Sequence, residues 1–115
     1  MSRQPTQAVS VAPDVFFWGA GKRISELALA SRIPSIFAFA ENVEVGGLMS
    51  YGVDTLYAVR RVATYIDKIF KGAKPGDLPI EQPAKVDLVI NRKTADALGL
   101  TIPQVLLLQA TKVIE

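Results

Sequence analysis

Five polar side chains lie in or just after short apolar runs and could contact a small molecule: Asp14, Glu41, Asn42, Tyr51 and Asp54. In doubly wound α/β sheets, ligands bind beyond the carboxyl ends of the strands, where the connecting loops converge. If the apolar runs are parallel strands, these side chains lie near that edge. Glu41 or Asp54 could then hold a ligand ammonium, while Tyr51 or Phe39 could stack on a ring or an acyl chain.

Four of these residues also have a structural interpretation. Asp54 precedes a helical pattern and could be its N-cap, and Glu41 could be a solvated carboxylate in a loop. Tyr51 could pack in the core, and Asp14 could form an Asx turn after Pro13. The sequence predicts ligand contacts at these positions and leaves the structural role open beside them.

Catalytic and metal-binding chemistry is poorly represented in the chain. There is no cysteine and no histidine, which excludes thiol nucleophiles, imidazole acid–base chemistry and Cys/His zinc sites within this chain. Glu41 and Glu44 are a pair of carboxylates, but nothing fixes their separation. Gly19 and Gly21 lack the third glycine of a dinucleotide fingerprint. We therefore expect no catalytic residue, no metal and no cofactor, and a small α/β enzyme is the least favoured alternative.

Charge and hydropathy argue against nucleic acid and a membrane span. The 13 basic and 11 acidic residues are interspersed, and half of the 115 residues are hydrophobic. We expect no nucleic-acid partner, and we interpret Arg60 and Arg61 as part of a solvated helix face. No apolar run is long enough to span a membrane. Residues 1–8 are polar and are expected to form a disordered tail, not a signal peptide, so a complete chain of this kind would be cytoplasmic.

The periodicity of apolar residues predicts strands alternating with helices. Strands are expected at 9–12, 35–39, 48–51 and 86–90, and helices at 22–32, 55–71, 92–98 and 104–113. The connection 40–47 is too short for a full crossover helix, so we expect the plain Rossmann repeat to be broken there. The pattern indicates an α/β protein with a partial doubly wound (Rossmann-like) parallel sheet.

Three phrases carry a family resemblance: GGLMSYG at 46–52, YIDKIFKGAKPGDLPIEQP at 65–83 and LVINRKTADALGLTIP at 88–103. In this order and spacing they resemble the C-terminal portion of ABC-transporter substrate-binding proteins of the tryptophan/tyrosine type, which have the type I periplasmic-binding-protein fold. The resemblance implies a periplasmic receptor that closes two lobes around a small, amino-acid-like solute and delivers it to an ABC permease.

The resemblance also suggests how the chain is divided. Residues 9–72 would be the α/β part of a solute-binding lobe, 73–83 a Pro-rich linker between lobes, and 84–115 a C-terminal strand with helices. Members of the family are much longer, so this chain resembles only their final portion.

Surplus apolar surface suggests association. The run Val15–Trp18 should be buried on all sides or lie in an interface, and Trp18 favours the interface. Short strands with unpaired edges are weakly stable alone. We therefore expect a homo-oligomer, and exchange of the elements after the linker between protomers is one way to form it. The alternative to a solute-binding protein is a structural remnant that folds as an oligomer and binds nothing.

Overall fold

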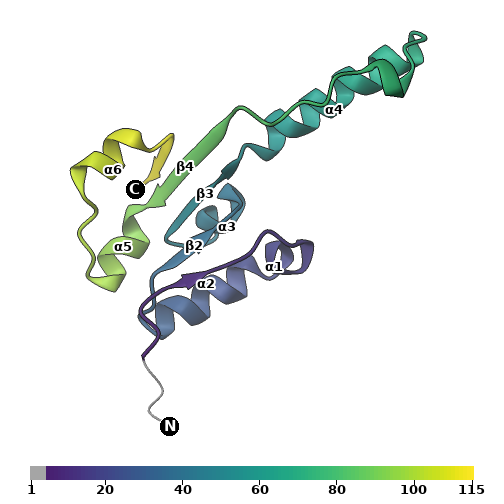
Figure 1. Ribbon diagram of the computed structural model, residues 1–115. Helices are drawn as coiled ribbons and strands as arrows, with labels where there is room; N and C mark the ends of the chain where they lie inside the picture. Colours follow the sequence, from purple (N-terminus) through teal and green to yellow (C-terminus); the bar gives the residue numbers. More distant parts are fainter. Residues whose placement is uncertain (1–4) are drawn as a thin grey trace.

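A computed structural model describes residues 5–115 and shows one five-stranded sheet flanked by helices (Figure 1). The strands, in sheet order, are β1 (Val9–Ser10), β2 (Ser35–Phe37), β3 (Met49–Val53), β4 (Val86–Asn91) and β5 (Lys112–Ile114). The first three are parallel, β4 is antiparallel to β3, and β5 is parallel to β4. The predicted α/β class is confirmed, and the predicted parallel pairing is present throughout the sheet except between β3 and β4, which are antiparallel.

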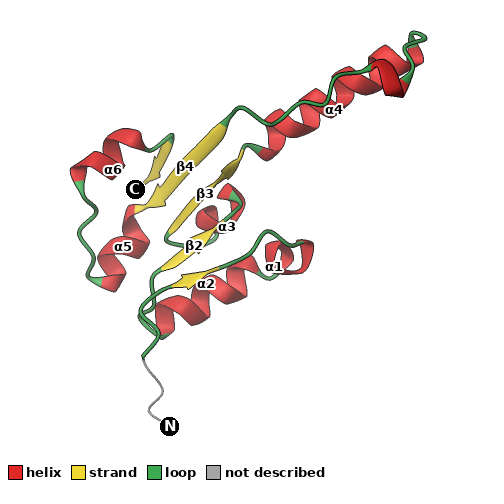
Figure 2. Ribbon diagram, in the orientation of Figure 1, coloured by secondary structure: helices red, strands yellow, loops and turns green. Residues whose placement is uncertain are grey.

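Helices account for most of the remaining chain (Figure 2). They are α1 (Val15–Gly19), α2 (Gly21–Ala30), α3 (Ala40–Glu44), α4 (Thr55–Phe70), α5 (Arg92–Leu98) and α6 (Gln104–Gln109), with a 3₁₀ turn at Pro75–Asp77. Of the predicted tail, residues 1–4 lie outside the described residues, and 5–8 are exposed and have no regular secondary structure.

Three helices begin where a short polar side chain caps them. Asp14, Asp54 and Asn91 accept hydrogen bonds from backbone N–H groups in the first turns of α1, α4 and α5, respectively. Each side chain satisfies an N–H that has no partner within the helix. The sequence therefore fixes these helix starts locally.

The expectation of a broken repeat between β2 and β3 is wrong. The two strands pair in parallel, and the five residues of α3 serve as the crossover. Such a short connection succeeds because Gly46 adopts φ 119° and Gly47 lies against the ring of Phe37, where an added Cβ would approach a ring carbon to 2.6 Å. Val43 on α3 is fully buried and supplies the contact that a longer helix would otherwise make.

The expected helix at 104–113 is too long, because the chain ends as strand β5. The N–H of Thr111 donates to the carbonyl of Leu88 (2.8 Å), and its hydroxyl accepts from the N–H of Leu88 (3.2 Å). These bonds turn the chain alongside β4, whose outer edge would otherwise be unpaired.

The core is small and lies where α2, α3 and α5 meet the sheet. Its largest fully buried side chains include Phe37, Ile90 and Val43. The amide of Asn91 donates to the carbonyl of Val43 (3.1 Å), and the hydroxyl of Thr94 donates to that of Gly46 (3.0 Å). Buried polar side chains therefore join the start of α5 to α3.

Between β3 and β4 the chain makes a long excursion away from the sheet (Figure 1). β3 leads into α4, and residues 71–85 return beside α4 to β4; we call α4 with residues 71–85 the arm. No residue of α4 is buried, although its sequence carries a strong apolar stripe. Val59 and Val62 on that stripe are 59% and 58% exposed. The predicted helix is present, and among the described residues the returning segment lies beside part of the stripe without burying it.

The aromatic run at the start of the chain is also uncovered. Val15, Phe16, Phe17 and Trp18 form α1, and none of them is buried. Of the two expected environments, burial on all sides is therefore wrong for this chain alone.

Gly52 provides a sharp test of the packing of β3 against the β2–α3 connection. A Cβ at this position would lie 2.0 Å from the backbone oxygen of Ala38, which cannot rotate away. We expect Gly52→Ala to lower the free energy of unfolding by about 3 kcal/mol, measured by urea denaturation followed by circular dichroism.

Gly76→Ala is the matched control, because nothing lies within 4 Å of its Cβ position. It should change the stability by less than about 0.5 kcal/mol. Equal stability of the two variants would contradict the close approach of β3 to Ala38.

Candidate functional site

Two adjoining hollows lie at the carboxyl ends of β1, β2 and β3. The smaller one measures about 100 Å³, and its lining includes three carboxylates from different elements: Glu41 of α3, Asp54 before α4 and Asp87 of β4. The larger one measures about 480 Å³ and is lined by residues 10–13, 36–39 and 51–53. Ala38, Gly52 and Val53 line both hollows, so they form one continuous concave edge.

Glu41 contributes to this edge a shielded carboxylate oxygen with spare bonding capacity. Its Oε2 atom is shielded from solvent and has no hydrogen-bond partner among the described residues. The side chain reaches the smaller hollow from the first turn of α3. Because a shielded carboxylate oxygen without a partner is costly, a cation or an N–H donor in the hollow would be stabilised there.

Asp54 lines the same hollow, but both of its oxygens are engaged. One accepts the backbone N–H of Tyr57 (2.9 Å), and the other accepts the ammonium of Lys85 (2.9 Å). The hydrogen bond from Lys85, followed by that from Tyr57, lowers the pKa of this carboxyl below its ordinary value. The N-cap interpretation of Asp54 is thus observed directly.

The other three predicted site residues lie outside the smaller hollow. Tyr51 is 63% exposed and lines the larger hollow, so its ring is available and not packed in the core. Asn42 is 3% exposed and faces α2, since a Cβ on Gly21 would lie 2.4 Å from its Oδ1. Asp14 accepts the N–H of Phe16 (2.8 Å) and lines neither hollow. The structure therefore brings together Glu41, Asp54 and Tyr51.

Sequence reasoning missed two charged residues beside the site. Asp87 lies opposite Gly52 in the β3–β4 pairing, and Lys85 lies just outside the last pair of that ladder. A polar residue inside the apolar strand pattern at 86–90 was the available signal for Asp87. Nothing local indicated Lys85, because its role depends on β4 returning antiparallel to β3.

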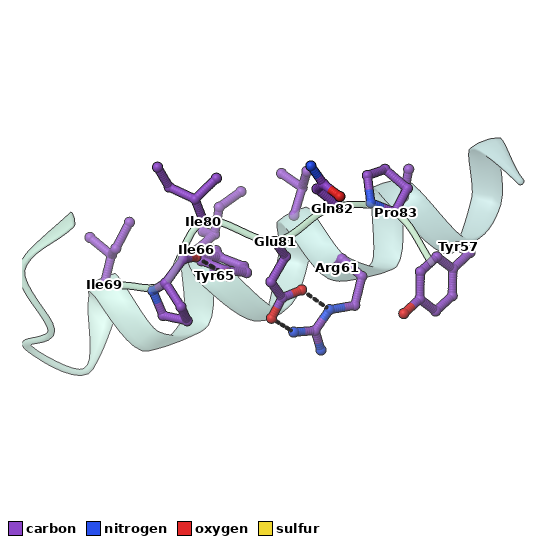
Figure 3. Close-up of a pocket in the computed structure, with 12 residues that line it drawn as sticks. Tyr57, Arg61, Tyr65, Ile66, Ile69, Ile80, Glu81, Gln82 and Pro83 are labelled. Atoms are coloured by element: carbon purple, nitrogen blue, oxygen red, sulfur yellow. Dashed lines mark hydrogen bonds and ion pairs between the residues drawn. The ribbon is translucent and has the colours of Figure 1, made fainter. Parts of the chain in front are cut away.

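A third hollow, of about 550 Å³, lies on the arm (Figure 3). The returning segment crosses α4 with Ile80 fully exposed, and Glu81 forms a two-point ion pair with Arg61. The hydroxyl of Tyr65 donates to the carbonyl of Pro79. The Pro-rich segment 73–83 therefore lies against α4 and is held there by these side-chain contacts.

The described residues hold no group of three or more carboxylate, imidazole or thiol side chains arranged for a metal ion. Within residues 5–115, no helix is both long enough and apolar enough to cross a bilayer. What this edge can do chemically is bind a small polar molecule next to an apolar surface.

The model of the ABC transporter substrate-binding protein family matches residues 2–114. The chain belongs to this family. No curated protein matches the sequence. Two solved structures resemble it over almost its whole length, each with a TM-score of 0.87. One is a conserved domain protein of Vibrio cholerae, 30% identical, with 93% of this chain and 36% of that chain covered. The other is an ABC domain from Streptococcus pneumonia in complex with L-Trp, 32% identical, with coverages of 94% and 37%.

A third structure supports the fold alone. It is the ligand-free, open form of CD0873, a substrate-binding protein with adhesive properties from Clostridium difficile, with 23% identity and a TM-score of 0.63. Across these comparisons, the chain spans slightly more than a third of the length of the structures it resembles. The resemblance to ABC-transporter substrate-binding proteins with a periplasmic-binding-protein-like fold is confirmed.

The contact between the returning segment and α4 should depend on pH. The Arg61 guanidinium beside Glu81 holds the pKa of that carboxyl below its ordinary 4.5. A lowered folded-state pKa means that the stabilisation is complete above the ordinary value and disappears as the pH falls through the folded-state value. We expect the amide NMR signals of Ile80 and Gln82 to move toward those of a detached segment in that acidic window. Glu81→Gln should lack this transition, and an identical pH profile in Glu81→Gln would contradict the assignment.

Proposed function

We propose that this chain forms one wall of the solute-binding cleft of an ABC uptake receptor, and that the solute is small and amino-acid-like. The observation that carries the proposal is the partnerless, shielded oxygen of Glu41 in a hollow at the carboxyl ends of parallel strands. Family membership supports it, because the match covers residues 2–114.

The two hollows suit the two ends of an amino acid. A primary ammonium fits the small hollow and would pair with Glu41, which is close to several acidic groups and has a free oxygen. The side chain of the solute would lie in the larger hollow, against Tyr51 and the apolar residues at the end of β2. The complex of the pneumococcal relative with L-Trp supports a solute of this class.

The carboxylate of such a solute needs a partner outside the small hollow, because three carboxylates already line that space. We place this partner in the portion of the receptor that corresponds to the rest of the relatives' length. Two lobes would then close around the solute, in a hinge motion. Delivery to an ABC permease and a periplasmic location belong to the same proposal. Binding and release need no catalytic group.

The arm suggests where one lobe ends. Residues 9–53 and 86–115 share the sheet, whereas the arm projects from it with an uncovered apolar stripe. We propose that the crossings between lobes lie at 53–54 and 85–86 and that the arm packs on the other lobe. The division suggested by the family resemblance puts residues 9–72, and with them α4, in the same lobe as the sheet. In the present proposal α4 and the Pro-rich segment 73–83 both belong to the arm instead.

Glu41→Gln tests solute binding. The change keeps the size of the side chain and removes its charge, so the affinity for the ammonium should fall at least about tenfold, or 1.4 kcal/mol. A panel of aromatic and aliphatic L-amino acids is first screened by thermal unfolding, where a ligand at a hundred times Kd adds about 2.7 kcal/mol. Calorimetry then compares the variants with the stabilising amino acid and with its deaminated analogue, whose affinity should not respond to Glu41→Gln.

Glu44→Gln is the matched control on the same helix. Glu44 pairs with Lys112 (2.7 Å) and lines neither hollow, so this variant should bind like the unmodified chain. Stabilisation by none of the amino acids would favour the alternative, a structural remnant that binds no solute. Equal affinity of Glu41→Gln and the unmodified chain would reject the role of Glu41.

The apolar stripe of α4 carries the related proposal that isolated chains associate through the arm. We expect sedimentation equilibrium to give a mass above the 12.4 kDa of one chain. Val59→Lys places a charge in the stripe and should shift the population toward monomer. Gln104→Lys adds the same charge at an exposed polar position and should leave the mass unchanged. A monomeric unmodified chain would contradict self-association.

A further inference from the structure

The two crossings between the sheet and the arm are joined by one ion pair. Val53 and Val86 form the outermost pair of the β3–β4 ladder. The next residue outward on each segment is Asp54 on one side and Lys85 on the other. Their Oδ2 and Nζ atoms lie 2.9 Å apart. Among the ion pairs of the described residues, this is the one that links the two crossing segments to each other.

Beyond this ion pair, the arm is held together by its own contacts. Arg61 binds Glu81, with 2.8 Å between Nε and Oε2, and the Tyr65 hydroxyl donates to the Pro79 carbonyl. These contacts lie further out along α4 on the face that meets the returning segment, which Figure 3 shows lying across the helix. These contacts hold the returning segment against α4.

The junction between arm and sheet has little other support. No residue of α4 is buried, so little apolar packing holds the angle at which the arm leaves the sheet. At the junction itself, the last pair of the β3–β4 ladder and the ion pair between Asp54 and Lys85 join the two crossing segments. Asp54 also caps α4 by accepting the N–H of Tyr57 (2.9 Å), so the same carboxylate contacts both Lys85 and the start of the helix. A displacement of Lys85 therefore acts on the first turn of α4.

Both members of the pair favour their charged forms. The hydrogen bond from Lys85 lowers the pKa of Asp54, and that bond to Asp54 raises the pKa of Lys85. The negative charge of Asp87 on β4 also raises the pKa of Lys85, whereas the positive charge of Arg60 on α4 lowers it. The side chains of Lys85 and Asp54 remain 53% and 23% exposed, so the contact can open and close without burying a bare charge.

We propose that the Asp54–Lys85 pair is a hinge clasp that sets the angle between the arm and the sheet. It ties the helix cap at the outgoing crossing to the start of β4 at the returning crossing. With the clasp closed, the two crossings bend together and the arm holds one orientation. With the clasp open, each crossing bends separately and the arm samples a range of angles.

A distance measurement across the hinge tests the clasp in the ligand-free chain. The protein has no cysteine, so Lys74→Cys on the arm and Lys93→Cys on α5 give two unique sites for spin labels. Both positions are exposed. Labelled protein is diluted into unlabelled protein, so that double electron–electron resonance reports distances within one chain even if chains associate. The unmodified junction should give one narrow distance distribution.

Two charge-neutralising variants should broaden that distribution. Lys85→Met keeps the aliphatic stem and removes the ammonium. Asp54→Asn removes the charge and keeps an N-cap of similar strength, so α4 should persist in the circular dichroism spectrum. Because each variant removes the same contact, the double variant should broaden the distribution no more than either single one.

Lys71→Met is the matched control, because it breaks the ion pair with Asp67 inside α4 and spares the junction. Its distance distribution should equal that of the unmodified junction. The proposal is overturned if Lys85→Met and Asp54→Asn also keep the narrow distribution, or if their effects add in the double variant. The test needs no solute, so a failure here is distinct from a failure of solute binding.

Discussion

The antiparallel ladder between β3 and β4 is the constraint on which the rest of this structure depends. It runs from the pair Met49–Ile90 to the pair Val53–Val86. Because the two strands are neighbours and run in opposite directions, everything from 54 to 85 must leave the sheet and return at one point. The ladder therefore produces the arm, and it brings Asp87 to the smaller hollow beside Asp54, where α3 contributes Glu41.

What the sequence predicted well is what is encoded locally. The helix starts predicted at 55 and 92 and the helix end predicted at 98 match the structure. Capping chemistry explains them, because Asp54 and Asn91 cap the two starts and Gly99 follows the end with φ 72°. The placement of Glu41 and Asp54 near strand ends also followed from apolar runs of the right length. These features depend on neighbours within a few residues, so a single sequence contains the information.

The remaining features depend on contacts between distant segments. Whether 110–114 continues a helix or forms a strand is decided by the edge of β4, to which Thr111 binds. Whether five residues suffice as a crossover is decided by how closely Gly47 approaches Phe37. The contact of Lys85 with Asp54 requires the antiparallel return of β4. Local patterns carry no information on the direction of β4. The α/β class could therefore be predicted, whereas the positions of Lys85 and Asp87 beside the site could not.

Two of the three carboxylates that line the smaller hollow illustrate why proximity to a site does not define a role. Asp54 and Glu41 line the same small space, but Asp54 spends one oxygen on the cap of α4 and the other on Lys85. A cation that enters the hollow would have to displace the ammonium of Lys85, which belongs to the same chain, in order to bind Asp54. At Glu41 the same cation would find an oxygen without a hydrogen-bond partner among the described residues. The effective concentration of a tethered partner is high, so the free carboxylate is the stronger attractor for a solute. Fixing one acidic group at the hinge therefore leaves the other available for binding.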